Sequence, residues 1–195
     1  MKNIIAIAGN ARSGKDTLAN NMVDIISSFK IKCAKFSFAS ALKKECDPFL
    51  KKTLGISAFT ENTDEKNIIR PMLVTWGTHV RRKLDPDIWV KSVDKMIKHN
   101  KVGIVSDLRF GNEYNWVREN GGFIIFIDRI DENGVKIPPA NDEELDNNDF
   151  LRKNADFHFT WLTTDNKDYI HALSYEAIVQ AIPENTIHKW TQTCR

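Results

Sequence analysis

The sequence lacks the features that mark secreted or membrane-spanning proteins. Its 195 residues include only three cysteines, whose wide spacing offers neither a Cys-x-x-Cys zinc pair nor a disulfide framework. The apolar run near the start, residues 4–8, is too short to span a membrane and has no signal-peptide cleavage pattern. We therefore expect a protein of the reducing cytoplasm.

Net charge is almost absent as well. The chain has 28 basic and 26 acidic residues, and the resulting charge of +2 gives no bulk attraction to a nucleic-acid polymer or a membrane. Any site for an anion must therefore be local. With 42% hydrophobic and 28% charged residues, the composition is that of an ordinary globular protein, and the length predicts a single domain over residues 1–195.

Alternating apolar segments predict an α/β fold. Short continuous apolar runs indicate strands buried on both faces, and apolar residues at helical spacing indicate helices between them. Such alternation predicts a parallel sheet flanked by helices on both faces, with ligands at the carboxyl ends of the strands. The predicted strands are 4–8, 34–38, 101–106, 123–127 and 157–162, and the predicted helices are 18–29, 41–54, 63–83, 88–97, 112–120 and 167–182.

Residues 131–149 differ from this pattern. Asp, Glu, Asn, Gly and two prolines dominate the segment, and apolar periodicity is weak. We therefore predict a loop that acts as a lid insertion in the domain. At the start of the predicted helix 41–54, Ser40 is expected to serve as the N-cap.

A phosphate-binding loop follows the first predicted strand. The G-x-x-x-x-G-K pattern stands between a strand and a helix, which is the context that a P-loop requires. The two glycines permit backbone N–H groups to converge on phosphate oxygens, and the lysine adds a positive charge for the β- and γ-phosphates of ATP. The loop consists of Gly9, Asn10, Ala11, Arg12, Ser13, Gly14, Lys15, Asp16 and Thr17.

One position of the loop departs from the usual pattern. Asp16 stands where Ser or Thr normally offers a hydroxyl to Mg²⁺, and Thr17 follows it. A carboxylate can hold magnesium directly or through water, so Asp16 is the candidate metal ligand.

Further charged residues follow the later strands. Transfer of a γ-phosphoryl group depends mainly on neutralising charge, so several cations should face one edge of the sheet. Lys15, Arg109 and Arg129 can meet that need, with Arg109 clamping the acceptor phosphate. Asp107 could bind a metal-bound water or orient the acceptor, or it could cap the helix that follows.

Several motifs resemble those of the phage deoxynucleoside monophosphate kinases. The loop from Arg12 to Thr17 is similar to theirs, and the resemblance runs from residue 4 to about residue 172. The positions that match are Lys43 in Ala-Ser-Ala-Leu-Lys, Arg70 before Trp-Gly-Thr, Trp89 in Trp-Val, Asp107 and Arg109 in Asp-x-Arg with Glu113 after them, Arg129 at a strand end, and Glu143 in the predicted lid.

The resemblance implies an activity and a set of roles. Members of that family transfer phosphate from ATP, with Mg²⁺, to deoxynucleoside monophosphates and are commonly dimers. Lys43 and Arg70 would then bind the acceptor phosphate, while Trp89 would stack on the base. Glu113 and Glu143 would belong to the substrate site, with Glu143 reaching it when the lid closes.

Two alternatives stay open. Animal-type phosphomevalonate kinase shares the Lys-Asp variant of the loop and the Asp-x-Arg motif, so another small-metabolite kinase is a rival. A noncatalytic nucleotide-binding module that kept the loop is the second. The sequence thus predicts a P-loop NTPase fold and a (deoxy)nucleoside monophosphate kinase that acts on small nucleotides.

Overall fold

The computed structural model divides the chain into two compact units. The structure describes residues 3–97, 101–136, 138, 142–162, 166–183 and 187, and only the backbone of 142–146. One unit combines Met1–Phe36 with Ile97–Arg195, and the other is Ser37–Met96. The first contains the sheet and the second is helical.

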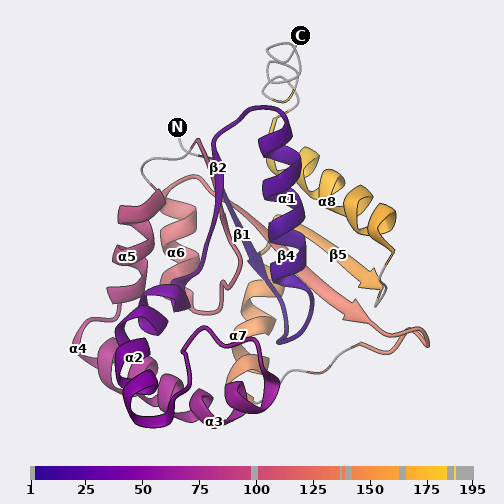
Figure 1. Ribbon diagram of the computed structural model, residues 1–195. Coiled ribbons are helices and arrows are strands. Elements are labelled where there is room, and N and C mark those ends of the chain that lie inside the picture. Colours follow the sequence, from indigo (N-terminus) through magenta and orange to yellow (C-terminus); the bar gives the residue numbers. More distant parts are fainter. Residues whose placement is uncertain are drawn as a thin grey trace. The chain divides into compact units, whose positions relative to one another are not determined.

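Five parallel strands form the sheet in the order β2-β3-β1-β4-β5 (Figure 1). Parallel pairing joins every neighbouring pair, with Ala6 opposite Val105 and Ala8 opposite Phe126. The predicted parallel α/β sheet is therefore confirmed. The strands are β1 (Asn3–Ala8), β2 (Cys33–Phe36), β3 (Val102–Val105), β4 (Phe123–Ile130) and β5 (Phe157–Leu162).

Helices α1 (Lys15–Ser28) and α8 (Lys167–Ala181) cover one face of this sheet, side by side in Figure 1. Successive strand residues point to opposite faces, so Ile5 and Ile7 of β1 share one face. Both belong to a buried cluster with Met22 of α1 and Ile178 of α8. This cluster is the main core of the sheet unit.

The opposite face holds Ile4 and Phe126, which are also almost fully buried. It is covered by α6 (Gly111–Glu119) and α7 (Asp142–Lys153), which contact β1. The guanidinium of Arg152 lies 4.5 Å from the ring centroid of Phe126, which places α7 against this face. Helices therefore cover both faces, as predicted.

The second unit has its own small core. Cys46, Leu50, Ala58 and Ile69 pack together and are almost fully buried. Its helical segments are α2 (Phe38–Leu54), α3 (Thr63–Val74), the π-helical segment η1 (Thr75–Arg81), α4 (Arg82–Leu84) and α5 (Ile88–Ile97), the last of which ends at the boundary of the units.

Two predictions of local structure are wrong. Ser40 lies inside α2, whose N-cap is Ser37, because helical backbone begins at Phe38 rather than near residue 41. Residues 142–149 belong to α7 and not to a loop. Tertiary contacts stabilise this polar helix, since its buried Leu151 and Asn148 pack within the sheet unit. The lid function of 131–149 stays a prediction, as does the single domain.

The cysteines that the structure describes, Cys33 and Cys46, are free thiols. Desolvation by burial raises the pKa of Cys33 to about 12, so this thiol stays protonated. Within the described part of the chain, no helix combines the length and the apolar character needed to cross a membrane.

Gly122 offers a test of the packing between α6 and the sheet. An added Cβ would lie 2.9 Å from the carbonyl oxygen of Val117 and 3.1 Å from that of Ile4, and backbone atoms cannot easily move. Gly122→Ala should therefore lower the free energy of unfolding by about 1–3 kcal/mol, measured by urea denaturation. The matched control is Gly111→Ala, whose Cβ meets nothing within 4 Å. Equal stability of the two variants would contradict this packing.

Candidate active site

The phosphate loop joins β1 to α1 through two glycines with positive φ. Gly9 has φ +146°, and a Cβ there would lie 2.4 Å from the carbonyl oxygen of Ile127. Gly14 has φ +90° and stands directly before the first residue of α1. A residue with a side chain would be strained at both positions because of the positive φ. At Gly9 its Cβ would also clash with the Ile127 carbonyl oxygen. The chain can therefore turn sharply and present N–H groups at the positive end of α1.

Lys15 is folded back over the loop. Its side chain is buried, and its ammonium donates hydrogen bonds to the carbonyl oxygens of Gly9 at 2.8 Å and Asn10 at 2.6 Å. These bonds hold the positive charge of Lys15 against the backbone of the phosphate loop. Ser13 is also buried, and among the described residues its hydroxyl has no hydrogen-bond partner. A buried donor of this kind suits a phosphate oxygen.

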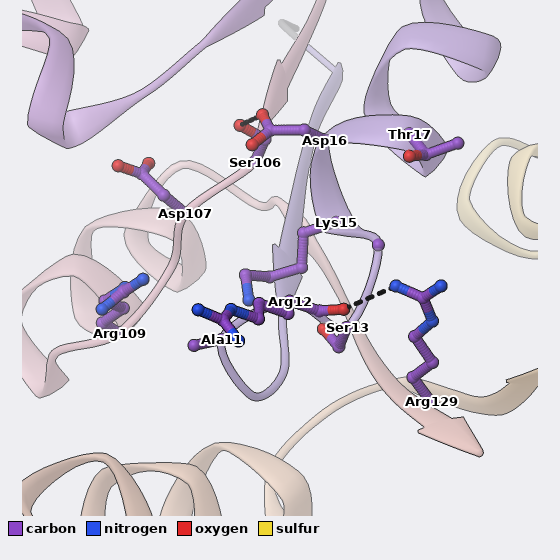
Figure 2. Close-up of a pocket in the computed structure, with 11 residues that line it drawn as sticks. Ala11, Arg12, Ser13, Lys15, Asp16, Thr17, Ser106, Asp107, Arg109 and Arg129 are labelled. Carbon is purple, nitrogen blue, oxygen red and sulfur yellow. Dashed lines mark hydrogen bonds between the residues drawn. The ribbon is translucent and has the colours of Figure 1, made fainter. Parts of the chain in front are cut away.

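A pocket of about 340 Å³ opens at the loop. Four basic and two acidic side chains line it, so positive charge predominates. Figure 2 shows Asp107 and Arg109 on one side of the loop and Arg129 on the other. The lining residues are Ala11, Arg12, Ser13, Gly14, Lys15, Asp16, Thr17, Ser106, Asp107, Arg109 and Arg129. The structure thus brings together all four residues predicted to be catalytic.

Arg129, at the carboxyl end of β4, reaches across to the phosphate loop. Its guanidinium donates a hydrogen bond of 3.0 Å to the carbonyl oxygen of Arg12 (Figure 2). Arg12 has φ +63°, which is uncommon for a residue other than glycine. Strained backbone of this kind persists where surrounding contacts hold it, often at functional sites. Arg129 is one such contact, so a charge from β4 also fixes the loop.

Glu113 fixes the turn that carries Arg109. This glutamate is only 1% exposed, and its carboxylate accepts the backbone N–H groups of Arg109 at 2.9 Å and Phe110 at 3.1 Å. Phe110 is the N-cap of α6, so Asp107 does not cap that helix. The position of Glu113 indicates support for Arg109, while direct contact of Glu113 with substrate stays a prediction.

Asp16 has two positively polarised neighbours. Its Oδ1 accepts hydrogen bonds from the Ser106 hydroxyl at 2.9 Å and the Lys35 ammonium at 3.2 Å. Desolvation raises the pKa of Asp16, but the bond from Ser106 and the charge of Lys35 outweigh it, so the pKa is lowered overall. The carboxylate therefore stays ionised at neutral pH.

The residues present fit both ATP and a divalent cation. The buried Ser13 hydroxyl, the Lys15 ammonium and the loop at the start of α1 suit phosphate oxygens. Asp16, Ser106 and Asp107 place two carboxylates and a hydroxyl at one side of the same pocket, and Mg²⁺ prefers oxygen ligands of this kind. Asp16 thus retains its predicted role as a candidate metal ligand.

Other predicted substrate residues lie outside the sheet unit or outside the described side chains. Lys43 belongs to α2, where its ammonium lies 5.8 Å from the Phe59 ring centroid, and Arg70 is an exposed residue of α3. Trp89, in α5, is 4% exposed and donates its indole N–H to the Gly77 carbonyl at 3.4 Å. The side chain of Glu143 lies outside the described residues. Substrate contact by these four residues stays a prediction.

Sequence reasoning missed three residues around the loop. Ser106 could have been found, because it directly follows the buried strand β3, whose carboxyl end the fold places at the site. Lys35 lies in β2 and pairs with Asp16, and Asn148 donates to the side chain of Asn10 at 2.7 Å. No local pattern identifies Lys35 or Asn148, since both contacts join segments far apart in the chain.

The parallel sheet, the phosphate loop and the cation-lined pocket define a kinase of the P-loop NTPase fold, which uses ATP. The family model described as phosphomevalonate kinase matches residues 7–123, more than half of the chain. This chain therefore belongs to the phosphomevalonate kinase family. The match includes the phosphate loop, Asp107 and Arg109, and ends at the start of β4.

Individual proteins are also similar to this chain. A protein of Acanthamoeba polyphaga mimivirus, whose name assigns it provisionally to the deoxynucleotide monophosphate kinases, is 29% identical over 148 residues, covering 65% of this chain and 74% of its own. Shikimate kinase from Bacteroides thetaiotaomicron has a similar fold, with 12% identity, a TM-score of 0.50, and 90% and 96% of the two chains covered. APS kinase of Mycobacterium tuberculosis, in complex with AMPPNP and APS, is 13% identical with a TM-score of 0.44. The similarity covers 92% of this chain and 96% of that one.

The Ser106 hydroxyl should keep the pKa of Asp16 low. We expect Ser106→Ala to raise this pKa, because the carboxylate loses a hydrogen bond that favours its charged form. Since the folded pKa is depressed, the stability gained from these contacts is present above the unfolded pKa and lost as the pH falls through the folded one. A ¹³C NMR titration of labelled Asp carboxyl groups measures the shift.

The control is Ser28→Ala, which removes a hydroxyl bound to the Ile25 carbonyl in α1. It should leave the Asp16 titration unchanged. An unchanged or lower pKa in the Ser106 variant would show that the hydroxyl does not stabilise the carboxylate.

Proposed function

We propose that this chain transfers the γ-phosphoryl group of ATP to the phosphate of a deoxynucleoside or nucleoside monophosphate. The observation that carries the proposal is the clustering of Lys15, Arg109 and Arg129 around one pocket at the phosphate loop. These cations come from three different segments of the chain. Such an arrangement suits two phosphorylated ligands better than one.

The charge of the ligands explains why several cations are needed. A phosphate monoester has a second pKa near 6 and carries about 1.5 to 2 negative charges at pH 7. A triphosphate beside it adds further negative charge, and the two would repel each other in water. Lys15 and Arg129 adjoin the loop, whereas Arg109 lies on the side of Asp107 (Figure 2). We assign the first two to ATP and Arg109 to the acceptor.

The reaction itself needs little covalent help from the protein. An oxygen of the acceptor phosphate forms a bond to the γ-phosphorus while the bond from that phosphorus to the β–γ bridging oxygen breaks, which releases ADP. The acceptor is already anionic, so no strong general base is required. Asp107 therefore orients the acceptor or a metal-bound water and does not need to remove a proton.

Asp16, Ser106 and Asp107 are the residues that would hold Mg²⁺. When bound, the ion would neutralise charge on the phosphate oxygens of ATP. The ionised Asp16 carboxylate replaces the hydroxyl that usually follows the loop lysine, and Ser106, directly after the neighbouring strand β3, contributes a hydroxyl. Lys35 partly balances the additional negative charge that Asp16 introduces.

The family match supports a second candidate, phosphomevalonate, as the acceptor. This compound is also a phosphate monoester, so the pocket at the phosphate loop suits both. The mimivirus relative favours a nucleotide, because its similarity continues over 74% of that protein and its name refers to deoxynucleotide monophosphates. Lys43 and Arg70 stay proposed ligands of the acceptor phosphate, and Trp89 stays a proposed stacking partner for the base of a nucleotide acceptor. A cytoplasmic homodimer stays the prediction of the sequence.

An acceptor panel tests the proposal. We expect deoxynucleoside or nucleoside monophosphates to stimulate ADP production from ATP and Mg²⁺, followed in a coupled assay. The Lys15→Met variant should lose at least about 100-fold in rate, because it lacks the charge that faces the γ-phosphate. Its melting temperature, compared with that of the unaltered chain, controls for loss of folding.

If only phosphomevalonate stimulates ADP production, the acceptor is phosphomevalonate and not a nucleotide. ATP binding without stimulation by any member of the panel would favour a noncatalytic nucleotide-binding module. A Lys15→Met variant with full activity would remove the phosphate loop from the reaction.

A further inference from the structure

One face of α7 is buried in the sheet unit although the helix is mostly polar. Asn148, Leu151 and Arg152 follow the i, i+3, i+4 spacing that places residues on one helix face. Asn148 is 5% exposed and Leu151 is fully buried, whereas Asp149 and Lys153 are exposed. The helix is therefore held by specific polar contacts as well as by apolar packing.

The first polar contact reaches the phosphate loop. The side-chain amide of Asn148 donates a hydrogen bond of 2.7 Å to the amide oxygen of Asn10, 138 residues away in the chain. Both side chains are buried, at 5% and 9% exposure. The backbone carbonyl of Asn10 in turn accepts the Lys15 ammonium at 2.6 Å. A single residue of the loop thus joins α7 to the lysine.

The second polar contact holds the other end of the same face. Arg152 forms a bidentate ion pair with Asp128, at the carboxyl half of β4, with 2.6 Å between Nη2 and Oδ1. Bidentate pairs of this kind fix orientation as well as adding energy. The next residue, Arg129, donates to the Arg12 carbonyl of the loop. Polar contacts therefore anchor helix α7 both to the phosphate loop and to β4, whose carboxyl end carries Arg129.

We propose that α7 braces the phosphate loop and that Asn148 is a positioning residue for ATP, acting through Asn10 on Lys15. This inference rests on the proposed use of the loop for ATP. Without the donor from Asn148, the side chain of Asn10 loses a buried hydrogen bond that ties the phosphate loop to α7. The loop would then lose the geometry that lets its N–H groups and Lys15 converge on phosphates.

The test compares two identical substitutions on neighbouring residues of the helix. Asn148→Leu removes the hydrogen bond at nearly constant volume and should raise the Kd for ATP about tenfold, measured by isothermal titration calorimetry. The KM for the acceptor should stay within about twofold. Asn147→Leu is the matched control and should leave both values unchanged.

Aspartate substitutions test whether Asn148 acts through its direct hydrogen bond to Asn10. Asn148→Asp should retain near-normal ATP affinity, because the Asn10 amide can turn and donate to the carboxylate. Asn10→Asp places a carboxylate in the phosphate loop itself and should weaken ATP binding by repulsion, although Asn148 can still donate to it. The double variant places two carboxylates together and should weaken ATP binding more than the product of the two single effects.

Three results would overturn the inference. One is an ATP Kd within twofold of normal in the Asn148→Leu variant while the unaltered chain binds ATP. Another is an equal loss of ATP and acceptor affinity in step with a lower melting temperature, which would indicate general destabilisation. Failure of the unaltered chain to bind ATP would overturn both this inference and the proposed function.

Discussion

Repulsion between phosphate groups is the constraint on which the site depends. A kinase that joins a triphosphate to a phosphate acceptor must hold several negative charges within a few ångströms, and water alone screens them too weakly for precise alignment. In this chain the sharp turn from β1 into α1, which needs Gly9 and Gly14, concentrates N–H groups and Lys15 at one point. All other parts of the site are arranged around this turn.

The strand order explains how further charges reach the turn. Strand β1 lies between β3 and β4, so the carboxyl ends of both neighbours flank the phosphate loop. The segment after β3 supplies Ser106, Asp107 and Arg109, and the end of β4 supplies Arg129. Parallel pairing makes this convergence automatic, because every strand ends at the same edge of the sheet. The helices on both faces then fix the segments that carry these side chains.

The sequence allowed prediction of those parts of the site that follow from strand ends. The phosphate loop, Asp107, Arg109 and Arg129 could be named because each lies shortly after the end of a predicted buried strand. Helix α7 was missed because its few apolar residues do not reveal a buried face that includes Asn148 and Arg152. Long-range polar contacts leave no local pattern.

The same limit applies to Lys35 and to the helix caps. Lys35 is one lysine in a short edge strand, and only the pairing of β2 with β3 places it near Asp16. Ser40 satisfies the usual preference for an N-cap, but the helix begins earlier, at Phe38. The division of the chain at Ser37 and Met96 likewise follows from packing within each unit.

The central claim is that one pocket accommodates ATP and a nucleotide acceptor together, with Arg109 on the acceptor side. Adenosine joined to a deoxynucleoside through five phosphates links both ligands and tests this claim most directly by isothermal titration calorimetry. If both ligands occupy the pocket together, the linked compound should bind at least about tenfold more tightly than ATP for one or more bases. The Arg109→Ala variant should lose this gain in affinity. Binding no tighter than that of ATP for any base, or a gain unaffected by Arg109→Ala, would contradict the account.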